Sequence, residues 1–428
     1  MNIFVEKFGG ASVNSADAVR NVENIILSEK KKRIVVISAM AKTTNKLENI
    51  ANLWFNERKF HTKQYEELVN FHYNIIKELF YDNAAKTNCL QQVDSLFCNL
   101  KNTTQNLSNL DYNFLYDSIV SYGEKISTTI VSNYLNYKEV KNQLISAVDI
   151  IKTDNNYRDA NIDWIKTEKM INQIVIPVIE TTDLIITQGF IGGTMEGLTT
   201  TLGREGSDFS AAIIAHCTKA QSMTVWKDVP GLLNADPKRI KHTTKILSVP
   251  YTEAVELSYY GAAIIHPKTV KPLENKNIPL YIKSFIKPNE QGTVICSNET
   301  ISPIVPNFIF KDNQILCSIT LNDLSFATES NIAKIFDILA KHKVKVNLMQ
   351  NSALSFSVCF DENRNILPEL LKDFEKENFA VRYNTDLQLI TIRHYTNEAI
   401  EEVIKNKNIL IEQKNRTTIQ YLVNNEQE

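Results

Sequence analysis

The chain has 428 residues and a formal net charge of −2, with 43% hydrophobic and 22% charged residues. This composition is typical of a globular protein, and the length favours two or three domains over one compact core. The balanced charge argues against a nucleic-acid-binding protein, and no apolar run reaches the length of a membrane span.

The cysteines and histidines show no disulfide or metal-binding pattern. The six cysteines are scattered without a CxxC pair, and the seven histidines show neither HxxxH nor HExxH spacing. We therefore expect reduced, mostly buried thiols and no metal held by the protein itself. The N-terminal residues lack the basic lead and long apolar core of a secretory signal, so a cytoplasmic protein is predicted.

Short apolar runs alternate with amphipathic segments over the first 285 residues. The near-continuous apolar run at residues 33–40 is typical of a strand covered on both faces. The alternation predicts βαβ units in a three-layer αβα arrangement around an open, mostly parallel sheet. Residues 56–104 are predicted to form a helical insertion without obvious chemistry. The expected strands are 2–8, 33–40, 143–148, 183–190 and 222–226, and the expected helices are 16–30, 163–180 and 207–216.

Glycines cluster after two of the expected strands. The first strand leads into KFGGAS, residues 7–12, in which a glycine pair lets the backbone approach a phosphate at the next helix N-terminus. Two glycines alone more often make a plain turn. The second cluster, residues 188–208, holds six of the twelve glycines and also leaves a strand end, where α/β sheets bind ligands. The absence of GxxxxGK[ST] excludes the P-loop class, and the absence of GxGxxG disfavours a dinucleotide fold.

The second glycine cluster ends in REGSD, residues 204–208, directly before an apolar helix. Ser207 or Asp208 is expected to cap this helix. The charges could simply face water, so this stretch alone does not decide between an ordinary capped helix and a binding site. A third stretch, WKDVPGLLNADPK at residues 226–238, follows another expected strand, and its turns could cover a nucleotide.

The character of the sequence changes near Lys287, where turn formers and prolines concentrate. Beyond this point the order β-α-β-β occurs twice. The first copy continues with a helix at 367–377 and a strand at 379–383, whereas the second copy stops before these elements. The predicted domains are 1–286 for the α/β part, 300–384 for the first copy and 385–428 for the second.

Five motifs in this order resemble those of the aspartate kinases: KFGGAS, SYGEKIST, GREGSD, KDVPGLLNADP and YGAAIIHPKTV. The resemblance covers nearly the whole chain. It implies the amino-acid kinase fold, followed by tandem ferredoxin-like βαββαβ ACT domains of which the second is short or intertwined with the first. It also implies ATP-dependent phosphorylation of the L-aspartate side-chain carboxylate to 4-phospho-L-aspartate, the first step of lysine, threonine and methionine biosynthesis.

The resemblance assigns roles in phosphoryl transfer. The aspartate carboxylate is already ionised at neutral pH, so the reaction needs no general base. Lys7 is expected to stabilise the transferred group and Asp208 to hold this lysine by charge pairing. Magnesium is expected with ATP, held largely by phosphates and water. The expected ATP-binding residues are Lys7, Gly9, Gly10, Ser38, Lys227, Asp228 and Lys238.

Substrate recognition needs charges opposite to those of aspartate. Arg204 is expected to grip a carboxylate with two hydrogen bonds, and Glu124 to accept the α-ammonium group. Thr44 and Ser207 match family positions that hydrogen-bond the substrate. Glu124 alone would more often be a solvated helix residue. His266, which precedes a proline, is interpreted as structural.

The chain departs from the family pattern at three positions. Glu205 stands where the family commonly has glycine, and Lys227 where it has threonine. Ala263 replaces a lysine that is often present. This removes a phosphate contact that Lys227 or Lys238 would have to replace.

The resemblance of the tail to ACT domains implies regulation by an amino acid, lysine or threonine, and assembly into a homodimer or a higher oligomer. Asn347 stands where lysine-sensing relatives often have an aspartate, so weaker lysine inhibition is expected. The expected effector-binding residues are Thr328, Glu329, Ile332, Val346, Asn347 and Ser352.

Two alternatives remain at this point. One is an amino-acid kinase for another acid such as acetylglutamate or glutamate. The pair of Glu124 and Arg204 argues against an acetylated substrate, because an acetylated amine gains nothing from a carboxylate partner. The other is a catalytically silent amino-acid sensor, against which the presence of both Lys7 and Asp208 argues.

Overall fold

The computed structural model of the chain describes residues 2–58, 61–106, 111–262, 265–297, 299–322, 326 and 328–425. The chain divides into two compact units. We call them the N-terminal unit, which comprises Met1–Leu232, Lys245–Ser258 and Ala263–Pro303, and the C-terminal unit, which comprises Leu233–Thr244, Tyr259–Ala262 and Ile304–Glu428.

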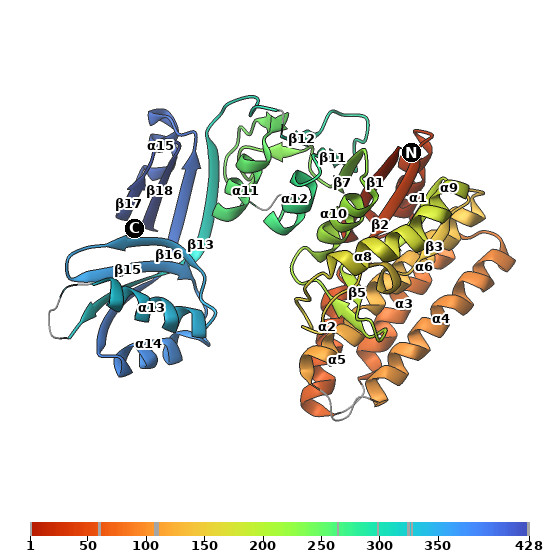
Figure 1. Cartoon of the computed structure of the whole chain (residues 1–428), viewed down its shortest axis with the longest axis horizontal. Helices are drawn as coiled ribbons and strands as arrows, with labels where there is room; N and C mark the ends of the chain where they lie inside the picture. Colours follow the sequence, from red (N-terminus) through yellow and green to blue (C-terminus); the bar gives the residue numbers. More distant parts are fainter. Residues whose placement is uncertain are drawn as a thin grey trace. The chain divides into compact units, whose positions relative to one another are not determined.

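The N-terminal unit is built on an eight-stranded sheet in the order β10-β12-β11-β7-β1-β2-β4-β3 (Figure 1). Neighbouring strands are parallel except for β11 and β12, so the predicted mostly parallel α/β sheet is confirmed. Its strands are β1 (Ile3–Phe8), β2 (Lys32–Ile37), β3 (Gln143–Ile145), β4 (Leu184–Gln188), β7 (Ser222–Lys227), β10 (Ser248–Val249), β11 (Leu280–Ser284) and β12 (Thr293–Ile295).

Helices cover both faces of this sheet (Figure 1). The helix α10 (Gly206–Thr218) packs on β1, β2 and β7, and α6 (Tyr122–Tyr137) packs on β2, β3 and β4. The remaining helices and short strands are η1 (Gly10–Val13), α1 (Ala16–Leu27), α2 (Thr43–Glu57), α3 (Thr62–Leu79), α4 (Asn83–Asn106), α5 (Tyr112–Val120), α7 (Ala147–Ile150), α8 (Trp164–Met170), η2 (Ile171–Val175), α9 (Ile176–Thr181), β5 (Ile191–Gly193), β6 (Thr199–Thr201), β8 (Leu232–Leu233), β9 (Lys245–Ile246), α11 (Tyr251–Tyr260) and α12 (Pro267–Glu274).

Several elements differ from the sequence prediction. The strand expected at 33–40 ends at Ile37 in β2. The strand expected at 143–148 ends at Ile145, and the short helix α7 follows directly. The helix expected at 163–180 is interrupted by a π-helical turn at Ile171–Val175. The next helical segment, α9, begins at Ile176, and Pro177 lies in its first turn. Because proline has no backbone N–H to donate, the preceding turn closes with longer i→i+5 hydrogen bonds instead.

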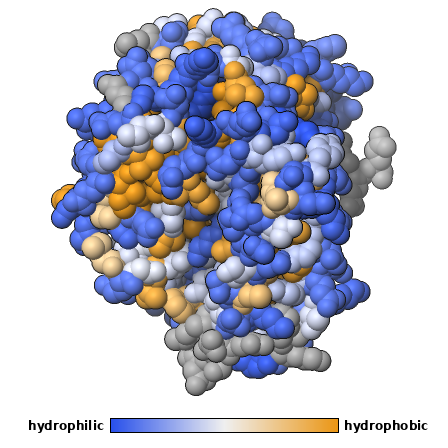
Figure 2. Space-filling model, turned by 90° about the vertical axis from the view of Figure 1, so that its right-hand side faces the viewer, coloured by the Kyte–Doolittle hydropathy of each residue, from blue (hydrophilic) through white to orange (hydrophobic). Residues whose placement is uncertain are grey.

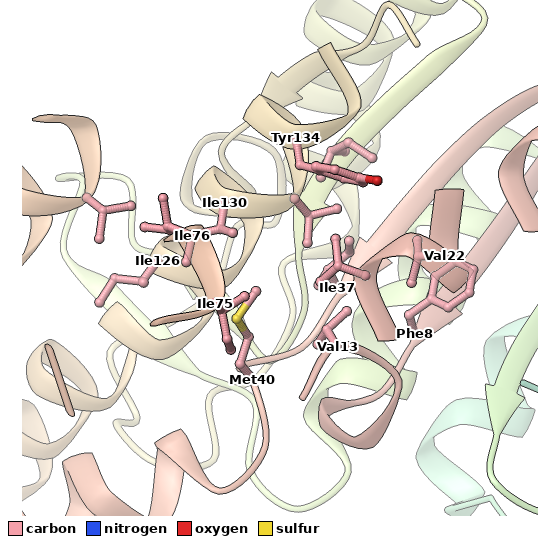
Figure 3. Close-up of a cluster of buried hydrophobic side chains, with 14 of the residues drawn as sticks. Phe8, Val13, Val22, Ile37, Met40, Ile75, Ile76, Ile126, Ile130 and Tyr134 are labelled. Atoms are coloured by element: carbon pink, nitrogen blue, oxygen red, sulfur yellow. The ribbon is translucent and has the colours of Figure 1, made fainter. Parts of the chain in front are cut away.

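The hydrophobic core lies under the carboxyl ends of β1 and β2. Phe8 at the end of β1 and Ile37 at the end of β2 pack with Val22 of α1, while Met40 lies beside Ile75 of α3 (Figure 3). The insertion predicted at 56–104 is helical, as expected, and its side chains enter this same core. The loops that follow β1 and β2 therefore rest on a rigid base.

The C-terminal unit contains a six-stranded antiparallel sheet in the order β14-β15-β13-β16-β18-β17. The central strands β13 (Asn307–Leu321) and β16 (Phe379–Arg393) are each 15 residues long. The predicted border at residue 384 lies inside β16. Residues 379–384 of β16 pair with the second half of β13, and 387–393 pair with its first half. The other elements are α13 (Glu329–Lys341), β14 (Val346–Asn351), β15 (Ser355–Asp361), α14 (Leu367–Lys376), α15 (Asn397–Ile404), β17 (Lys407–Lys414) and β18 (Thr418–Asn425).

The long shared strands join the two predicted copies of the C-terminal repeat. Each half of the β13–β16 pair carries its own cluster of buried side chains, one under α13 and α14 and the other under α15. The repeat seen in the sequence therefore corresponds to two βαββ arrangements along one sheet.

Hydrophilic residues predominate on the face shown in Figure 2, and a contiguous hydrophobic area lies among them. Within the part of the chain that the structure describes, no helix is long and apolar enough to cross a membrane. Four of the six cysteines are buried and all six are unpaired, as the sequence predicted.

Candidate active site

A pocket of about 420 Å³ lies in the N-terminal unit at the carboxyl ends of β1, β2 and β7. This is the edge at which open parallel sheets bind ligands. Its walls come from the loops after these strands and from the first turns of α6 and α10. The lining residues are Lys7, Gly9, Gly10, Ala11, Ser12, Ser38, Ala39, Ala41, Thr44, Glu124, Phe190, Gly203, Glu205, Gly206, Ser207, Asp208, Trp226, Lys227 and Asp228.

The loops after β1 and β2 are held together where they line the pocket. The amide of Ala41 donates to the Gly10 carbonyl at 3.0 Å, and the amide of Ser38 donates to the Phe8 carbonyl at 3.1 Å. A Cβ atom on Gly10 would lie 2.7 Å from the Ala39 carbonyl oxygen, so only glycine fits at this position. The second glycine of KFGGAS is therefore required by the close approach of the two loops.

The charged centre of the pocket consists of two lysines around one carboxylate. Lys7 Nζ lies 2.6 Å from Asp208 Oδ1, and Lys227 Nζ lies 4.0 Å from Asp208 Oδ2. The Lys7 and Asp208 side chains are only 11% and 6% exposed, so their ion pair is shielded from bulk water. The structure thus brings together the pair that the sequence predicted and adds Lys227 to it.

The helix α10, which carries Asp208, begins one residue earlier than predicted. The expected cap by Ser207 or Asp208 is wrong: the N-cap residue is Glu205, and its side chain makes no capping hydrogen bond. The Asp208 carboxylate pairs with Lys7 instead of capping its own helix. Gly206 occupies the first helical position because a Cβ there would lie 2.7 Å from Phe190 Cδ2.

Glu124 is a buried lining residue of the pocket and lies in the first turn of α6. Its Oε1 accepts a hydrogen bond from the Ala39 amide at 3.3 Å, whereas its buried Oε2 has no partner among the described residues. Burial raises the pKa of Glu124 to about 8. The preceding Gly123 allows this approach, since a Cβ there would lie 2.9 Å from Ala39 Cβ. The free oxygen is suited to accept a hydrogen bond from a ligand.

The other residues expected at the active site divide into three groups. Ser38, Thr44, Ser207 and Asp228 line the pocket. The Arg204 side chain is exposed and is not part of the lining. The last group is not placed at the pocket: Lys238 belongs to the C-terminal unit, and Ala263 lies outside the described residues. His266 caps α12 by accepting a hydrogen bond from the Lys268 amide, as a structural histidine would.

The residues expected to bind an effector lie in the C-terminal unit. Thr328, Glu329 and Ser352 are exposed, whereas Ile332, Val346 and Asn347 are half-buried. The side chain of Asn347 already has protein partners. Its Oδ1 accepts from Lys311 Nζ at 2.8 Å, and its Nδ2 donates to both Gln314 Oε1 and Asp361 Oδ1 at 2.9 Å.

Trp226 and Glu205 are among the lining residues that were not assigned a role from the sequence. Trp226 stacks on Phe8 with ring centroids 5.9 Å apart, and its buried Nε1 has no partner among the described residues. Glu205 was identified only as a departure from the family pattern. The burial of its Oε2 atom could not be predicted, because the motif says nothing about side-chain direction at a residue outside the helix.

A metal held by protein groups alone finds no support in the described ranges. They contain no cluster of three or more histidine, cysteine, aspartate or glutamate side chains arranged to bind a metal ion. The pocket nevertheless has free carboxylate oxygens on Glu124 and Glu205. These atoms suit a hydrated cation that arrives with a ligand.

Comparisons with known proteins agree with this geometry. Residues 2–284 match the model of the amino acid kinase family. The chain is 31% identical over 360 residues to the lysine-sensitive aspartokinase 3 of Escherichia coli, covering 84% of this chain and 78% of that protein. Two crystal structures of E. coli aspartokinase III cover 99% of the chain. The complex with aspartate and ADP has a TM-score of 0.83 at 27% identity over 97% of that chain. The complex with lysine and aspartate has a TM-score of 0.81 at 28% identity over 96% of that chain.

Proposed function

Because the chain belongs to the amino acid kinase family and, within it, to the aspartokinases, we propose that it phosphorylates the side-chain carboxylate of L-aspartate. ATP supplies the γ-phosphoryl group, and the product is 4-phospho-L-aspartate. The observation that carries this proposal is the shielded ion pair of Lys7 and Asp208 in a glycine-lined pocket at the end of a parallel sheet.

The chemistry requires two anions to meet. The aspartate carboxylate and the γ-phosphate are both negatively charged and repel each other. The site must therefore neutralise charge rather than remove a proton. Lys7 is the cation for the transferred group, and Asp208 fixes its ammonium group at 2.6 Å. The missing side chain of Gly9 leaves room for phosphate oxygens, since a Cβ there would meet only Lys7 Nζ, at 3.4 Å. Lys227, 4.0 Å from the same carboxylate, provides a second cation on the nucleotide side.

A magnesium ion bound with ATP would neutralise further phosphate charge. The pocket fits such an ion, since it lacks a protein cage but holds carboxylates with free oxygens. Asp228 and Lys238 stay proposed contacts of the nucleotide.

A second group of residues is proposed to recognise the aspartate substrate. The unpartnered Oε2 of Glu124 is placed to accept the α-ammonium group, with Thr44 and Ser207 as further hydrogen-bonding groups. Arg204 is the proposed partner of a substrate carboxylate. Its side chain is exposed, so this role requires it to turn into the pocket when aspartate binds.

The function is tested by following acyl phosphate trapped with hydroxylamine in the presence of ATP and a panel of acidic amino acids. We expect product with L-aspartate and none with glutamate or acetylglutamate. Product with another acid instead of L-aspartate would show that the chain acts on a different substrate. An inactive protein that still binds amino acids would instead be a sensor.

The charge state of Glu124 predicts a pH dependence for aspartate. With the pKa of the buried carboxyl at about 8, the carboxylate that attracts the α-ammonium group is lost as pH falls below this value. We expect kcat/KM for aspartate to rise roughly fivefold to tenfold between about pH 7 and about pH 8.5. Glu124→Gln should lower kcat/KM and abolish this rise, whereas an unchanged profile would remove Glu124 from ammonium binding.

The proposed role of Arg204 predicts a selective effect on one substrate. Arg204→Lys keeps the charge but loses the two-pronged hydrogen bond, so the KM for aspartate should rise about tenfold while that for ATP changes little. Arg20→Lys, at a half-buried position on α1 outside the pocket lining, is the matched control. Equal changes in both KM values would contradict the assignment.

The C-terminal unit is the proposed regulatory part, and we expect lysine to inhibit only weakly. The Asn347 amide is already bonded to Lys311, Gln314 and Asp361, and it offers no charge to an ε-ammonium group. Threonine is the alternative effector. Lysine, threonine and methionine should be titrated singly and in pairs while activity and thermal stability are followed. If none changes either quantity at millimolar concentrations, the unit is structural only.

We also propose that the enzyme acts in the cytoplasm as a homodimer or a higher homo-oligomer. The proposal rests on the resemblance of its tail to ACT domains. Light scattering of the full chain measures its mass in solution, and a monomer at micromolar concentration would contradict the proposed assembly.

A further inference from the structure

Glu205 lines the pocket, and both its backbone conformation and its side-chain environment are energetically unfavourable. Its backbone is left-handed, with φ of 55°, a conformation that glycine adopts easily and glutamate does not. Its side-chain oxygen Oε2 is buried and has no hydrogen-bond partner among the described residues. A strained backbone and an unsatisfied buried carboxylate oxygen together point to a ligand that the side chain serves.

The charges of the pocket indicate what kind of ligand it can bind. Only two lining side chains, Lys7 and Lys227, are cationic, and both are directed at Asp208. Four lining side chains are carboxylic acids: Glu124, Glu205, Asp208 and Asp228. Even with Glu124 neutral, carboxylates outnumber ammonium groups. Such a pocket can receive a polyanionic nucleotide only if the nucleotide brings a cation with it.

We propose that Glu205 holds the divalent cation that accompanies the nucleotide, by accepting hydrogen bonds from the water molecules around that ion. The proposal rests on the ATP-dependent reaction proposed above. A contact through water is favoured because the described ranges contain no cluster of three metal-binding side chains, and magnesium gives up its water reluctantly. Anions around the hydration shell of a metal strengthen its binding and fix its position.

The position of Glu205 favours the metal over the α-ammonium group of the substrate. Glu205 directly precedes the first turn of α10, which carries Asp208. Lys7 and Lys227, the proposed phosphate contacts, both lie beside the Asp208 carboxylate. The ammonium group already has a suitable acceptor in Glu124, which comes from α6 and has its own free oxygen. The two unsatisfied carboxylates thus serve two different cations.

The test compares the full chain with Glu205→Gln and Glu205→Gly. The glutamine variant keeps the strained backbone and removes the charge, whereas the glycine variant removes both. ADP affinity is measured by calorimetry over a range of magnesium concentrations, and thermal stability is measured without ligands. Glu196→Gln, at an exposed position on the turn between β5 and β6, controls for the loss of one negative charge.

We expect the gain in ADP affinity that magnesium produces to fall about tenfold in both Glu205 variants and not in Glu196→Gln. ADP affinity without magnesium should stay equal or rise, because a carboxylate near the phosphates is gone. The ligand-free glycine variant should melt about 2 °C higher than the wild type, since its backbone strain is relieved.

A magnesium dependence equal to that of the wild type in both variants would overturn the inference. So would a raised KM for aspartate with unchanged magnesium dependence, because Glu205 would then serve the ammonium group. The binding measurement does not depend on turnover. A wild-type chain that binds ADP with magnesium yet does not phosphorylate aspartate would refute the proposed function and leave the role of Glu205 to be judged from the variants.

Discussion

Replacing Lys7 with alanine is expected to lower the maximal rate of aspartate phosphorylation by about 10²–10³-fold while the fold stays intact. The Lys7 ammonium is 2.6 Å from Asp208 inside a shielded pocket, so it is held in place before the charge of the transition state develops. Alanine removes this fixed cation, and water replaces it poorly. The rate is measured at saturating ATP and aspartate, together with the melting temperature.

Lys227→Ala is the matched control for this experiment. Lys227 lies farther from the same carboxylate, at 4.0 Å, and is more exposed, at 24% against 11% for Lys7. We expect its loss to raise the KM for ATP more than it lowers the maximal rate. A Lys7→Ala enzyme within a few-fold of the wild-type rate would remove Lys7 from catalysis.

The sheet of the N-terminal unit could be predicted because its strands are strongly apolar. Residues 34–37 are fully buried in β2, and such a run fits a central strand of a covered parallel sheet. The short β3 was overestimated, since apolar residues continue from the strand into α7 without a change in composition. The shared strand β16 shows a similar limit. Two repeat copies meet inside it. Asn384 and Asp386 stand at the border, and Asp386 has a left-handed φ of 57°, but the pairing with β13 continues on both sides of them.

The charged centre could be predicted from the motifs, whereas the directions of single side chains could not. Lys7 and Asp208 are about 200 residues apart in sequence, yet their motifs fix them at adjacent positions, β1 and α10, which pack together. The exposed Arg204 and the buried oxygen of Glu205 are neighbours in sequence with opposite environments. Their difference arises from the left-handed backbone at Glu205, a tertiary feature that composition does not reveal.

Replacing Gly10 with alanine is expected to weaken ADP binding by about 10²-fold and to lower the melting temperature by several degrees. The new Cβ would lie 2.7 Å from the Ala39 carbonyl oxygen and 2.9 Å from that of Ala41. Both contacts are with backbone, which cannot rotate away as a side chain can. The loops after β1 and β2 must therefore separate, and both of them line the pocket. Calorimetry with ADP and a thermal melt measure the two effects.

Gly9→Ala is the matched control, because it adds the same methyl group one residue earlier. Its Cβ would meet only Lys7 Nζ, at 3.4 Å, and its backbone φ of −76° is open to alanine. We therefore expect the melting temperature of Gly9→Ala to stay close to that of the wild type. Its ADP affinity should still fall if the Gly9 backbone contacts phosphate, so the two variants separate a loss of loop packing from a loss of room for the ligand. A Gly10→Ala chain as stable as Gly9→Ala, with wild-type ADP affinity, would show that the two loops do not need their close contact to form the site.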